Sequence, residues 1–139
     1  MHFAVIIPGI PAPQGSKRHL GNGILVEASK RLKPWRADAI AAIQAEQHAC
    51  SCPQFAGPVR IAAAFVFPRP RGHYRANGTL KPSAPSLHAV RPDLDKLIRA
   101  LLDAATQSGI IRDDSQVYHI AANKTYAEAG WTSLIIDDE

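Results

Sequence analysis

Two apolar runs along the chain predict β-strands. The run over residues 3–7 is rich in β-branched side chains and stops at Pro8-Gly9, which predicts a buried strand. The run over residues 59–67 follows Gly57-Pro58 and is apolar at nearly every position. Because strands that are buried on both faces have this pattern, the second run predicts the central strand of a sheet.

Two helices are predicted by the spacing of apolar residues. Pro34 suits a first helical turn, and residues 37–49 are rich in good helix formers, with Ile40 and Ile43 on one side. A later stripe ends at Gly109, and either Asp93 or Asp95 stands where an N-cap belongs. The stripe consists of Leu94, Leu97, Ile98, Leu101, Leu102 and Ala105. It predicts a second helix with one apolar face.

Two further strands are predicted near the C-terminus. Residues 116–125 and 131–136 have strand-like composition, and residues 128–130 between them suit a turn. The order strand, helix, strand, helix, strand, strand predicts an α/β (α+β) fold, with a single mixed sheet of about four strands and two helices packed on it. A length of 139 residues suits one domain over residues 1–139.

Basic stretches rich in proline and glycine interrupt these elements. Residues 11–33 predict a basic loop or hairpin whose ends are strand-like. Residues 68–92 hold five prolines, five Lys or Arg and no acidic residue, which predicts a long basic loop. Because loops of this length in a small domain are usually functional or disordered, the second stretch is a candidate contact surface.

Charge is divided unevenly along the chain. The net charge is +4, but residues 1–92 carry 12 Lys or Arg against 3 Asp or Glu, whereas residues 93–139 carry 4 against 9. A basic segment beside a cluster of acidic residues suits a protein that attracts a polyphosphate and binds a divalent metal ion at a single site. Solvated surface charge is the alternative.

Composition narrows the class of protein. Apolar residues make up 46% and charged residues 20%, as in ordinary globular proteins. We expect a cytoplasmic protein, because no apolar run is long enough for a membrane helix and the N-terminus lacks a signal segment. The chain has only two cysteines, Cys50 and Cys52, which are too few for a disulfide framework, and we interpret both as incidental thiols.

Four aspartates flank the second predicted helix. Asp93 and Asp95 stand at its beginning, and Asp113 and Asp114 follow its end. About 14 helical residues at about 1.5 Å each separate the two pairs by about 21 Å, so they meet only if the next strand runs back along the helix. If Asp95 is the N-cap, Asp93 and Asp95 lie in extended backbone and point to one side.

Such a gathering of carboxylates suits a hard divalent cation. Closely packed carboxylates repel one another, and Mg²⁺ or Mn²⁺ relieves that repulsion. The ion can activate water and neutralise charge that develops on a phosphodiester. The alternative is an ordinary N-capping aspartate together with a surface turn at residues 113–114.

Arg99 and Lys124 are the cations that could hold a phosphate beside these acids. Arg99 shares one helix face with Asp95 and Asp103, and for Asp103 a surface ion-pair ladder is the preferred interpretation. The six histidines show no metal-ligand spacing, so we expect them on the surface or in packing. The sequence contains no phosphate-binding loop and no Ser or Cys nucleophile motif.

The motifs around the acids resemble those of one known family. Residues 91–99 read Arg-Pro-Asp-Leu-Asp-Lys-Leu-Ile-Arg, residues 103–105 read Asp-Ala-Ala, and residues 111–117 read Ile-Arg-Asp-Asp-Ser-Gln-Val, followed by Lys124. Together with the first strand, residues 11–18 and the helix at Trp35, they resemble the RusA family of Holliday-junction resolvases. The resemblance implies a small homodimer, common in phages and prophages, that uses Mg²⁺ to cut four-way DNA junctions in paired strands.

The resemblance also implies roles for individual residues. It places the three catalytic metal ligands on Asp93, Asp95 and Asp114, with Arg99 as a further catalytic cation. The family usually has Asn and Lys at the positions of Lys96 and Arg99. Charge is kept at Arg99, but arginine does not exchange protons as lysine does, and Lys96 could contribute an amine instead. The expected DNA-binding residues are Lys17, Arg18, Arg69, Arg71, Arg75, Lys81, Arg91, Lys96 and Lys124.

The sequence therefore predicts a metal-dependent endodeoxyribonuclease for branched DNA, using Mg²⁺ or Mn²⁺, dimeric and cytoplasmic in a bacterial host, without a membrane or a small-molecule cofactor. A non-catalytic or weakly catalytic branched-DNA-binding protein on the same scaffold is the alternative. It would bind junctions in a salt-sensitive way without metal-dependent turnover. A restriction-type nuclease is less well supported, since no Asp or Glu followed by x-Lys lies suitably downstream of Pro92-Asp93.

Overall fold

The computed structural model describes residues 1–15, 17–19, 25–27 and 30–139, and for residues 17–19 and 25–27 it describes the backbone alone. The main sheet is built from β1 (His2–Pro8), β4 (Val59–Pro68), β5 (Val117–Ala127) and β6 (Trp131–Asp137). The helices are α1 (Leu32–Ala49) and α2 (Leu94–Ser108), with short 3₁₀ turns η1 (Arg71–His73) and η2 (Asp114–Gln116). A separate hairpin pairs β2 (Lys17–His19) with β3 (Leu25–Glu27).

The sheet is mixed, as predicted. Its order is β1-β6-β4-β5, in which β4 pairs in parallel with β5 and antiparallel with β6, and β6 pairs antiparallel with β1. The second apolar run is thus a central strand, confirming its prediction. The two C-terminal strands follow each other in sequence but are separated by β4, because β6 inserts between β1 and β4.

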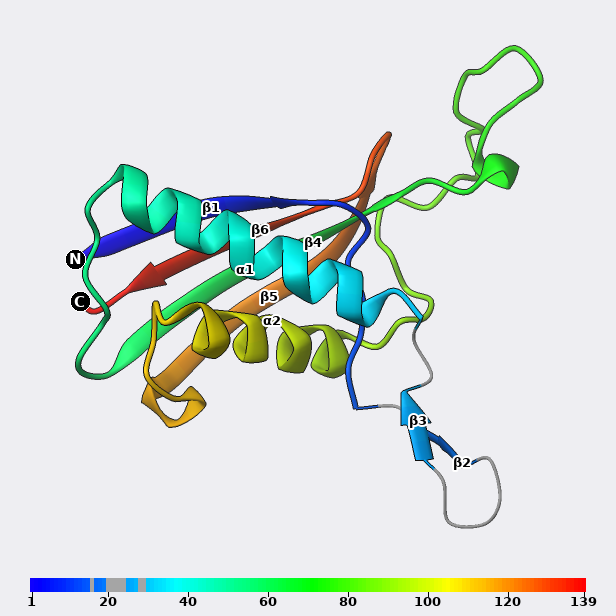
Figure 1. Cartoon of the computed structure of the whole chain (residues 1–139). Helices are drawn as coiled ribbons and strands as arrows, with labels where there is room; N and C mark the ends of the chain where they lie inside the picture. The colour runs from blue at the N-terminus through cyan, green and yellow to red at the C-terminus, as the bar shows by residue number, and fades with distance from the viewer. Residues whose placement is uncertain (16, 20–24, 28–29) are drawn as a thin grey trace.

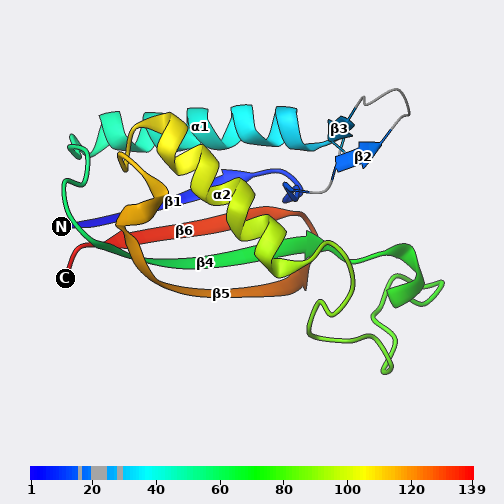
Figure 2. The same cartoon turned by 90° about the horizontal axis from the view of Figure 1, so that it is seen from below.

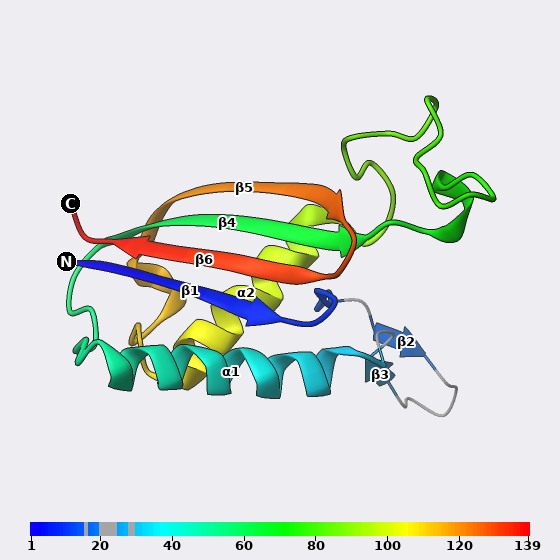
Figure 3. The same ribbon diagram turned by 90° about the horizontal axis from the view of Figure 1, so that it is seen from above.

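Both helices pack on the same face of the sheet (Figures 1 and 2). The opposite face of the sheet is in front in Figure 3, where the helices lie behind or beside the strands. Strand β1 consequently alternates, with Phe3 and Ile7 buried and Ala4 and Ile6 exposed. The prediction of a buried strand over residues 3–7 is correct for one face only, because β1 is an edge strand of a sheet covered on one side.

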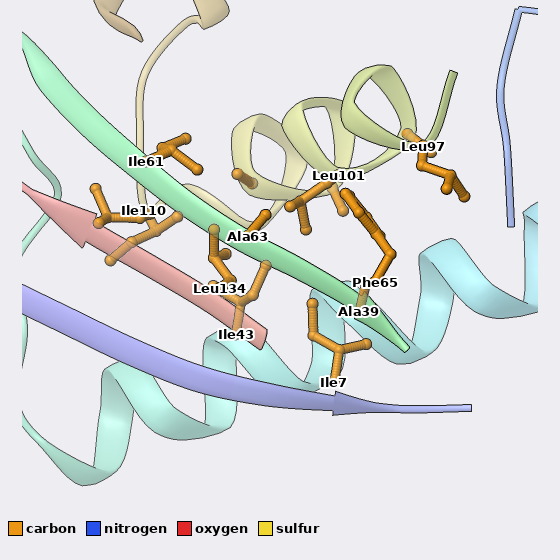
Figure 4. Close-up of a cluster of buried hydrophobic side chains, with 14 of the residues drawn as sticks. Ile7, Ala39, Ile43, Ile61, Ala63, Phe65, Leu97, Leu101, Ile110 and Leu134 are labelled. Atoms are coloured by element: carbon orange, nitrogen blue, oxygen red, sulfur yellow. The ribbon is translucent and has the colours of Figure 1, made fainter. Parts of the chain in front are cut away.

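The core lies between this sheet and the two helices (Figure 4). The period-two pattern of β4 sends Ile61, Ala63 and Phe65 toward the helices. The apolar stripe of α2 meets them through Leu97 and Leu101, each 1% exposed. The sequence therefore fixes α2 on the sheet by its apolar face and leaves its polar face outward.

The apolar pattern predicts where α2 ends but leaves open which aspartate begins it. Asp93 is the N-cap, with extended backbone at φ −70° and ψ 143°, and Asp95 already lies in the first helical turn. Of the two alternatives, Asp93 as N-cap is confirmed. The expectation that followed from Asp95 as N-cap, that both aspartates are extended and point to one side, is wrong because Asp95 is already helical. At the other end Gly109 adopts φ 87°, a left-handed conformation that glycine tolerates, as its position in the sequence predicts.

Two segments project from the same end of the molecule, where α2 begins (Figures 1 and 3). One is the β2–β3 hairpin, and the other is the segment of residues 69–91 between β4 and α2, which we call the basic arm. The basic arm contains η1 and a small hairpin in which Tyr74 pairs with Leu80, so the predicted loop has local structure of its own. Within the described part of the chain, no helix is long and apolar enough to cross a membrane.

Candidate active site

Asp93 and Asp95 lie at the N-terminus of α2, at the foot of the basic arm. Both are exposed, and the side chain of Asp93 is 56% accessible. Although Asp93 is the N-cap residue, the structure records no capping hydrogen bond to its carboxylate, which lies 3.7 Å from the Lys96 ammonium. The carboxylate of Asp93 is thus not used to stabilise the helix end and is accessible from solvent.

Asp114 lies at the opposite end of α2. Its carboxylate accepts a hydrogen bond of 2.7 Å from the Thr106 hydroxyl, in the last helical turn. Thr106 is 11 positions beyond Asp95, or about 16 Å along the axis at about 1.5 Å per residue. Strand β5 does run back along α2, but it starts at Val117, after Asp114, so one chain does not bring the three predicted metal acids together.

The position of Asp114 is fixed by its neighbours in η2. Asp113 caps this turn by accepting a hydrogen bond from the Ser115 backbone N–H at 3.0 Å. Hydrogen bonding from the Ser115 side chain, and then from its backbone N–H, lowers the pKa of Asp113. The buried side chain of Gln116 donates to the carbonyls of Phe55 and Gly57, both at 2.9 Å. These contacts fix η2 beside the C-terminal end of α2.

Within one chain, Asp93 and Asp95 are two of the three acids predicted to hold a metal ion. Among the described residues, no three His, Cys, Asp or Glu side chains gather in a way that could hold a metal. Two carboxylates nevertheless fit Mg²⁺, which commonly keeps several waters and takes one or two protein carboxylates together with substrate phosphate oxygens. Asp93 and Asp95 are therefore a chemically suitable but incomplete ligand set.

The Lys124 ammonium contacts the backbone beside the acid pair, and its predicted contact with a DNA phosphate stays a prediction. Its ammonium donates to the carbonyl of Val90 at 2.7 Å and to the carbonyl of Pro92 at 2.8 Å. Pro92 directly precedes Asp93 in the chain, and Val90 lies three residues before it. Lys124 therefore fixes the backbone that carries Asp93, a role that composition and spacing could not reveal.

An aromatic cluster anchors the base of the basic arm on β5. The ring of His88 stacks on Phe67 with centroids 4.2 Å apart and packs against Tyr126 at 4.8 Å, while the Arg69 guanidinium lies 5.1 Å from the Tyr126 ring centre. His88 is buried, and burial followed by the nearby charge of Lys124 lowers its pKa from the usual 6.5. One of the six histidines is thus a packing residue, as predicted.

The polar face of α2 contacts a segment that sequence analysis did not assign to the site. The Gln14 amide donates to the Asp103 carboxylate, and the Arg36 guanidinium donates to the Gln14 side-chain oxygen at 2.5 Å. Arg36 also lies 4.0 Å from Asp103. The surface-ladder interpretation of Asp103 is therefore wrong, because its carboxylate joins the segment before β2 to both helices.

Arg99 is exposed, but its guanidinium lies against the same segment. The guanidinium lies so close to Gly15 that a Cβ at that position would overlap it, and Gly15 adopts φ +98°. Gln14 and Gly15 belong to residues 11–18, which the family resemblance had singled out, so a signal for them existed in the sequence. The signal did not say which side chains they would meet.

The other predicted DNA-binding cations whose side chains the structure describes lie in two places, on the basic arm and beside Asp93. Arg71, Arg75, Lys81 and Arg91 are exposed along the basic arm, and Arg69 stands at its base, donating to the Pro85 carbonyl at 2.6 Å. Lys96 lies beside Asp93. The side chains of Lys17 and Arg18 lie outside the part of the chain that the structure describes. All of these DNA contacts stay predictions.

The chain matches a known family over most of its length. The family model described as Endodeoxyribonuclease RusA matches residues 8–136 of the chain. The match covers α1, α2 and the basic arm, and both acid pairs lie within it. No curated protein matches the chain.

Proposed function

This chain belongs to the RusA family of endodeoxyribonucleases, and from that premise we propose that it is a Mg²⁺-dependent endonuclease that resolves four-way DNA junctions by paired strand incisions. The observation that carries the proposal is the exposed pair Asp93 and Asp95, placed at a helix N-terminus and at the foot of an arm without acidic residues. The cations of the basic arm would attract DNA, and the two carboxylates would provide metal ligands for its cleavage.

Asp93 and Asp95 would hold the metal ion. When bound, Mg²⁺ or Mn²⁺ activates a water molecule and neutralises charge on the phosphodiester. The partial positive charge at the N-terminus of α2 would also attract the negative charge of a phosphate that approaches the two carboxylates. Lys96, 3.7 Å from Asp93, and Arg99, one turn further on, supply cations that orient the phosphate.

The basic arm would contact the DNA backbone. Its five cations are Arg69, Arg71, Arg75, Lys81 and Arg91. Phosphate contacts of this kind position a protein without reading sequence, and a branched substrate offers phosphates on several arms. Because the arm leads directly into Asp93, a phosphate chain bound along it would pass beside the acid pair.

A homodimer would complete the metal site with an acid from the partner. Asp95 and Thr106 are 11 positions apart, close to three turns of about 3.6 residues, so they share the outward face of α2. If the two α2 helices of a dimer run antiparallel with these faces together, the Asp114 of each subunit approaches the acid pair of the other. The half-buried Ile98 and Leu102 near the middle of α2 would supply apolar contact.

The decisive experiment is cleavage of a labelled four-way junction with Mg²⁺, using wild-type protein and the variants Asp93→Asn and Asp95→Asn. We expect the wild type to cut the junction in preference to duplex of the same sequence. Each variant should lose cutting by at least about 100-fold, since a metal ligand is lost, while junction binding is kept or strengthened by reduced phosphate repulsion. Asp38→Asn, on α1, is the matched control and should cut normally.

A branched-DNA-binding protein with little or no catalysis is the second candidate. The observation that favours it is that a single chain keeps Asp114 at the far end of α2 from the acid pair. Salt-sensitive junction binding without metal-dependent cutting would support this candidate and overturn the nuclease.

A further inference from the structure

The basic arm carries exposed apolar side chains as well as cations. Of the six large hydrophobic residues that are exposed in the described part of the chain, three belong to the arm: Leu80, Leu87 and Val90. Leu87 is 68% exposed and Val90 is 60% exposed. Phosphate binding needs no such residues, so the cations do not explain them.

Local anchoring keeps Leu87 and Val90 outward. Between them, His88 occupies the buried site on Phe67 and Tyr126, and its backbone N–H donates to the Lys124 carbonyl at 3.3 Å. Leu87 forms a bridge with Thr125, and the Val90 carbonyl is bound by Lys124. We call the exposed side chains of Leu87 and Val90 the apolar ledge.

The apolar ledge lies next to the acid pair. Val90 is three residues before Asp93, and the same Lys124 ammonium holds the carbonyls of Val90 and Pro92. This common anchor holds the backbone of Val90 close to that of Pro92, which directly precedes Asp93. Whatever contacts the ledge is therefore close to the phosphodiester that the acids would cut.

Base exposure distinguishes the kinds of DNA that could fit this surface. Continuous duplex covers its base faces by stacking and presents phosphates outward, whereas a branch point interrupts the stack and leaves apolar base faces accessible. Cations beside exposed apolar side chains, with no acid from residue 69 to residue 91, match a phosphate chain whose bases are unstacked nearby.

We propose that the apolar ledge contacts unstacked bases at the branch point and so makes the protein prefer branched DNA over continuous duplex. The inference rests on the proposed function and adds to it the feature of the substrate that is recognised. The phosphate-binding cations supply affinity for any DNA, and the ledge supplies the difference between the two substrates.

The test compares Leu87→Ser/Val90→Ser with the conservative Leu87→Met/Val90→Ile and with Ile6→Ser, an exposed apolar residue of β1. Kd values for a four-way junction and for duplex of the same sequence are measured in metal-free buffer, where cutting is absent. We expect the serine variant to lose about tenfold in its ratio of junction to duplex affinity, because apolar contact area is removed while the phosphate contacts stay. Its salt dependence should not change, and the other two variants should keep the wild-type ratio.

Other outcomes would overturn the inference in distinguishable ways. A serine variant that keeps the wild-type ratio, or that loses affinity for both DNAs equally, would remove the ledge from branch recognition. Conversion of a dimer to a monomer by the same variant, measured by sedimentation, would show that the ledge contacts a second copy of the chain. If the wild type shows no preference for the junction, both the proposed role of the apolar ledge and the proposed substrate are overturned. If the wild type prefers the junction but does not cut it, only the proposed nuclease activity is overturned.

Discussion

The ammonium of Lys124 ends between two backbone carbonyls, those of Val90 and Pro92. From its charge and its place in the sequence, Lys124 is a candidate phosphate contact. The two roles differ in what is lost with the side chain: a phosphate contact contributes to affinity and salt dependence, whereas a backbone anchor contributes to stability and to the position of Asp93.

Lys124→Met tests which role is correct. We expect the free energy of unfolding to fall by about 1–3 kcal/mol, because two hydrogen bonds from a charged donor are removed. Junction cutting should fall by about tenfold or more as Asp93 loses its fixed position, since small misplacements reduce catalysis strongly. Junction Kd should change little.

The exposed Lys81 of the basic arm is the matched control. Lys81→Met should leave stability and turnover unchanged but weaken binding and reduce the salt slope by about one counterion. If Lys124→Met behaves in that way instead, Lys124 is a phosphate contact and not an anchor.

His88 gives a pH dependence whose sign follows from its burial. Because the folded state lowers the pKa of His88 below 6.5, the unfolded chain takes up the proton first as the pH falls. The stability contributed by neutral His88 is therefore present above about pH 6.5 and decreases as the pH falls below that value toward the folded-state pKa.

Urea unfolding at pH 7.5 and pH 5.5 measures this effect. We expect the midpoint of the wild type to fall between the two pH values, and His88→Phe, which keeps an aromatic ring against Phe67, to show a smaller fall. His2→Phe, at an exposed histidine, should behave as the wild type does. An equal fall in wild type and His88→Phe would assign the pH dependence to other groups.

At the scale of elements, η2 determines where Asp114 lies. Gln116 uses its whole side-chain amide there: Oε1 accepts from the backbone N–H groups of Arg112 and Asp113 at 2.6 and 3.0 Å, and Nε2 donates to two carbonyls before β4. One buried side chain thus connects the end of α2, the start of β5 and the strand beside it. The pattern of apolar residues contains no information about these bonds.

Gln116→Ala should therefore destabilise the protein strongly. We expect a loss of about 2–4 kcal/mol in the free energy of unfolding, because two carbonyls and two N–H groups are left without this partner. Chemical denaturation measures it, with Gln107→Ala, an exposed position of α2, as the control that should change stability by less than about 0.5 kcal/mol. A loss as small as that of the control would mean that water replaces the amide.

At the scale of the whole molecule, the proposed site depends on two chains. One polypeptide places Asp93 and Asp95 at one end of α2 and Asp114 at the other. In an antiparallel dimer each site would then consist of two acids from one subunit and one from its partner. A site shared between subunits predicts that two different inactive variants regain activity when they are combined in one heterodimer, which a site within one chain does not predict.

Mixing two inactive variants tests it. Asp93→Asn/Asp95→Asn and Asp114→Asn should each be inactive as homodimers. Heterodimers of the two, co-expressed with different tags and purified through both, should regain one intact site and nick one strand of a labelled junction. Heterodimers of each variant with wild type are the controls, and a mixed heterodimer without activity beside active controls would contradict completion by the partner.

The sequence by itself determined the four main strands, the two helices and their order along the chain. The apolar runs of β4 and the stripe of α2 predict buried strand and amphipathic helix because local periodicity is set by backbone geometry. Gly109 likewise predicts a helix end, and the motifs around Asp93 identify the family before any coordinate is known. These are properties of neighbouring residues, which a sequence records directly.

Only the tertiary structure decided which distant side chains meet. Gln14 reaches Asp103 across 89 positions, and Lys124 reaches Val90 across 34. No periodicity or motif in the sequence indicates which residue each of them contacts, because that depends on how two elements are packed by apolar residues elsewhere. For the same reason the acids at the two ends of α2 resemble one cluster in the sequence but lie apart in the folded chain.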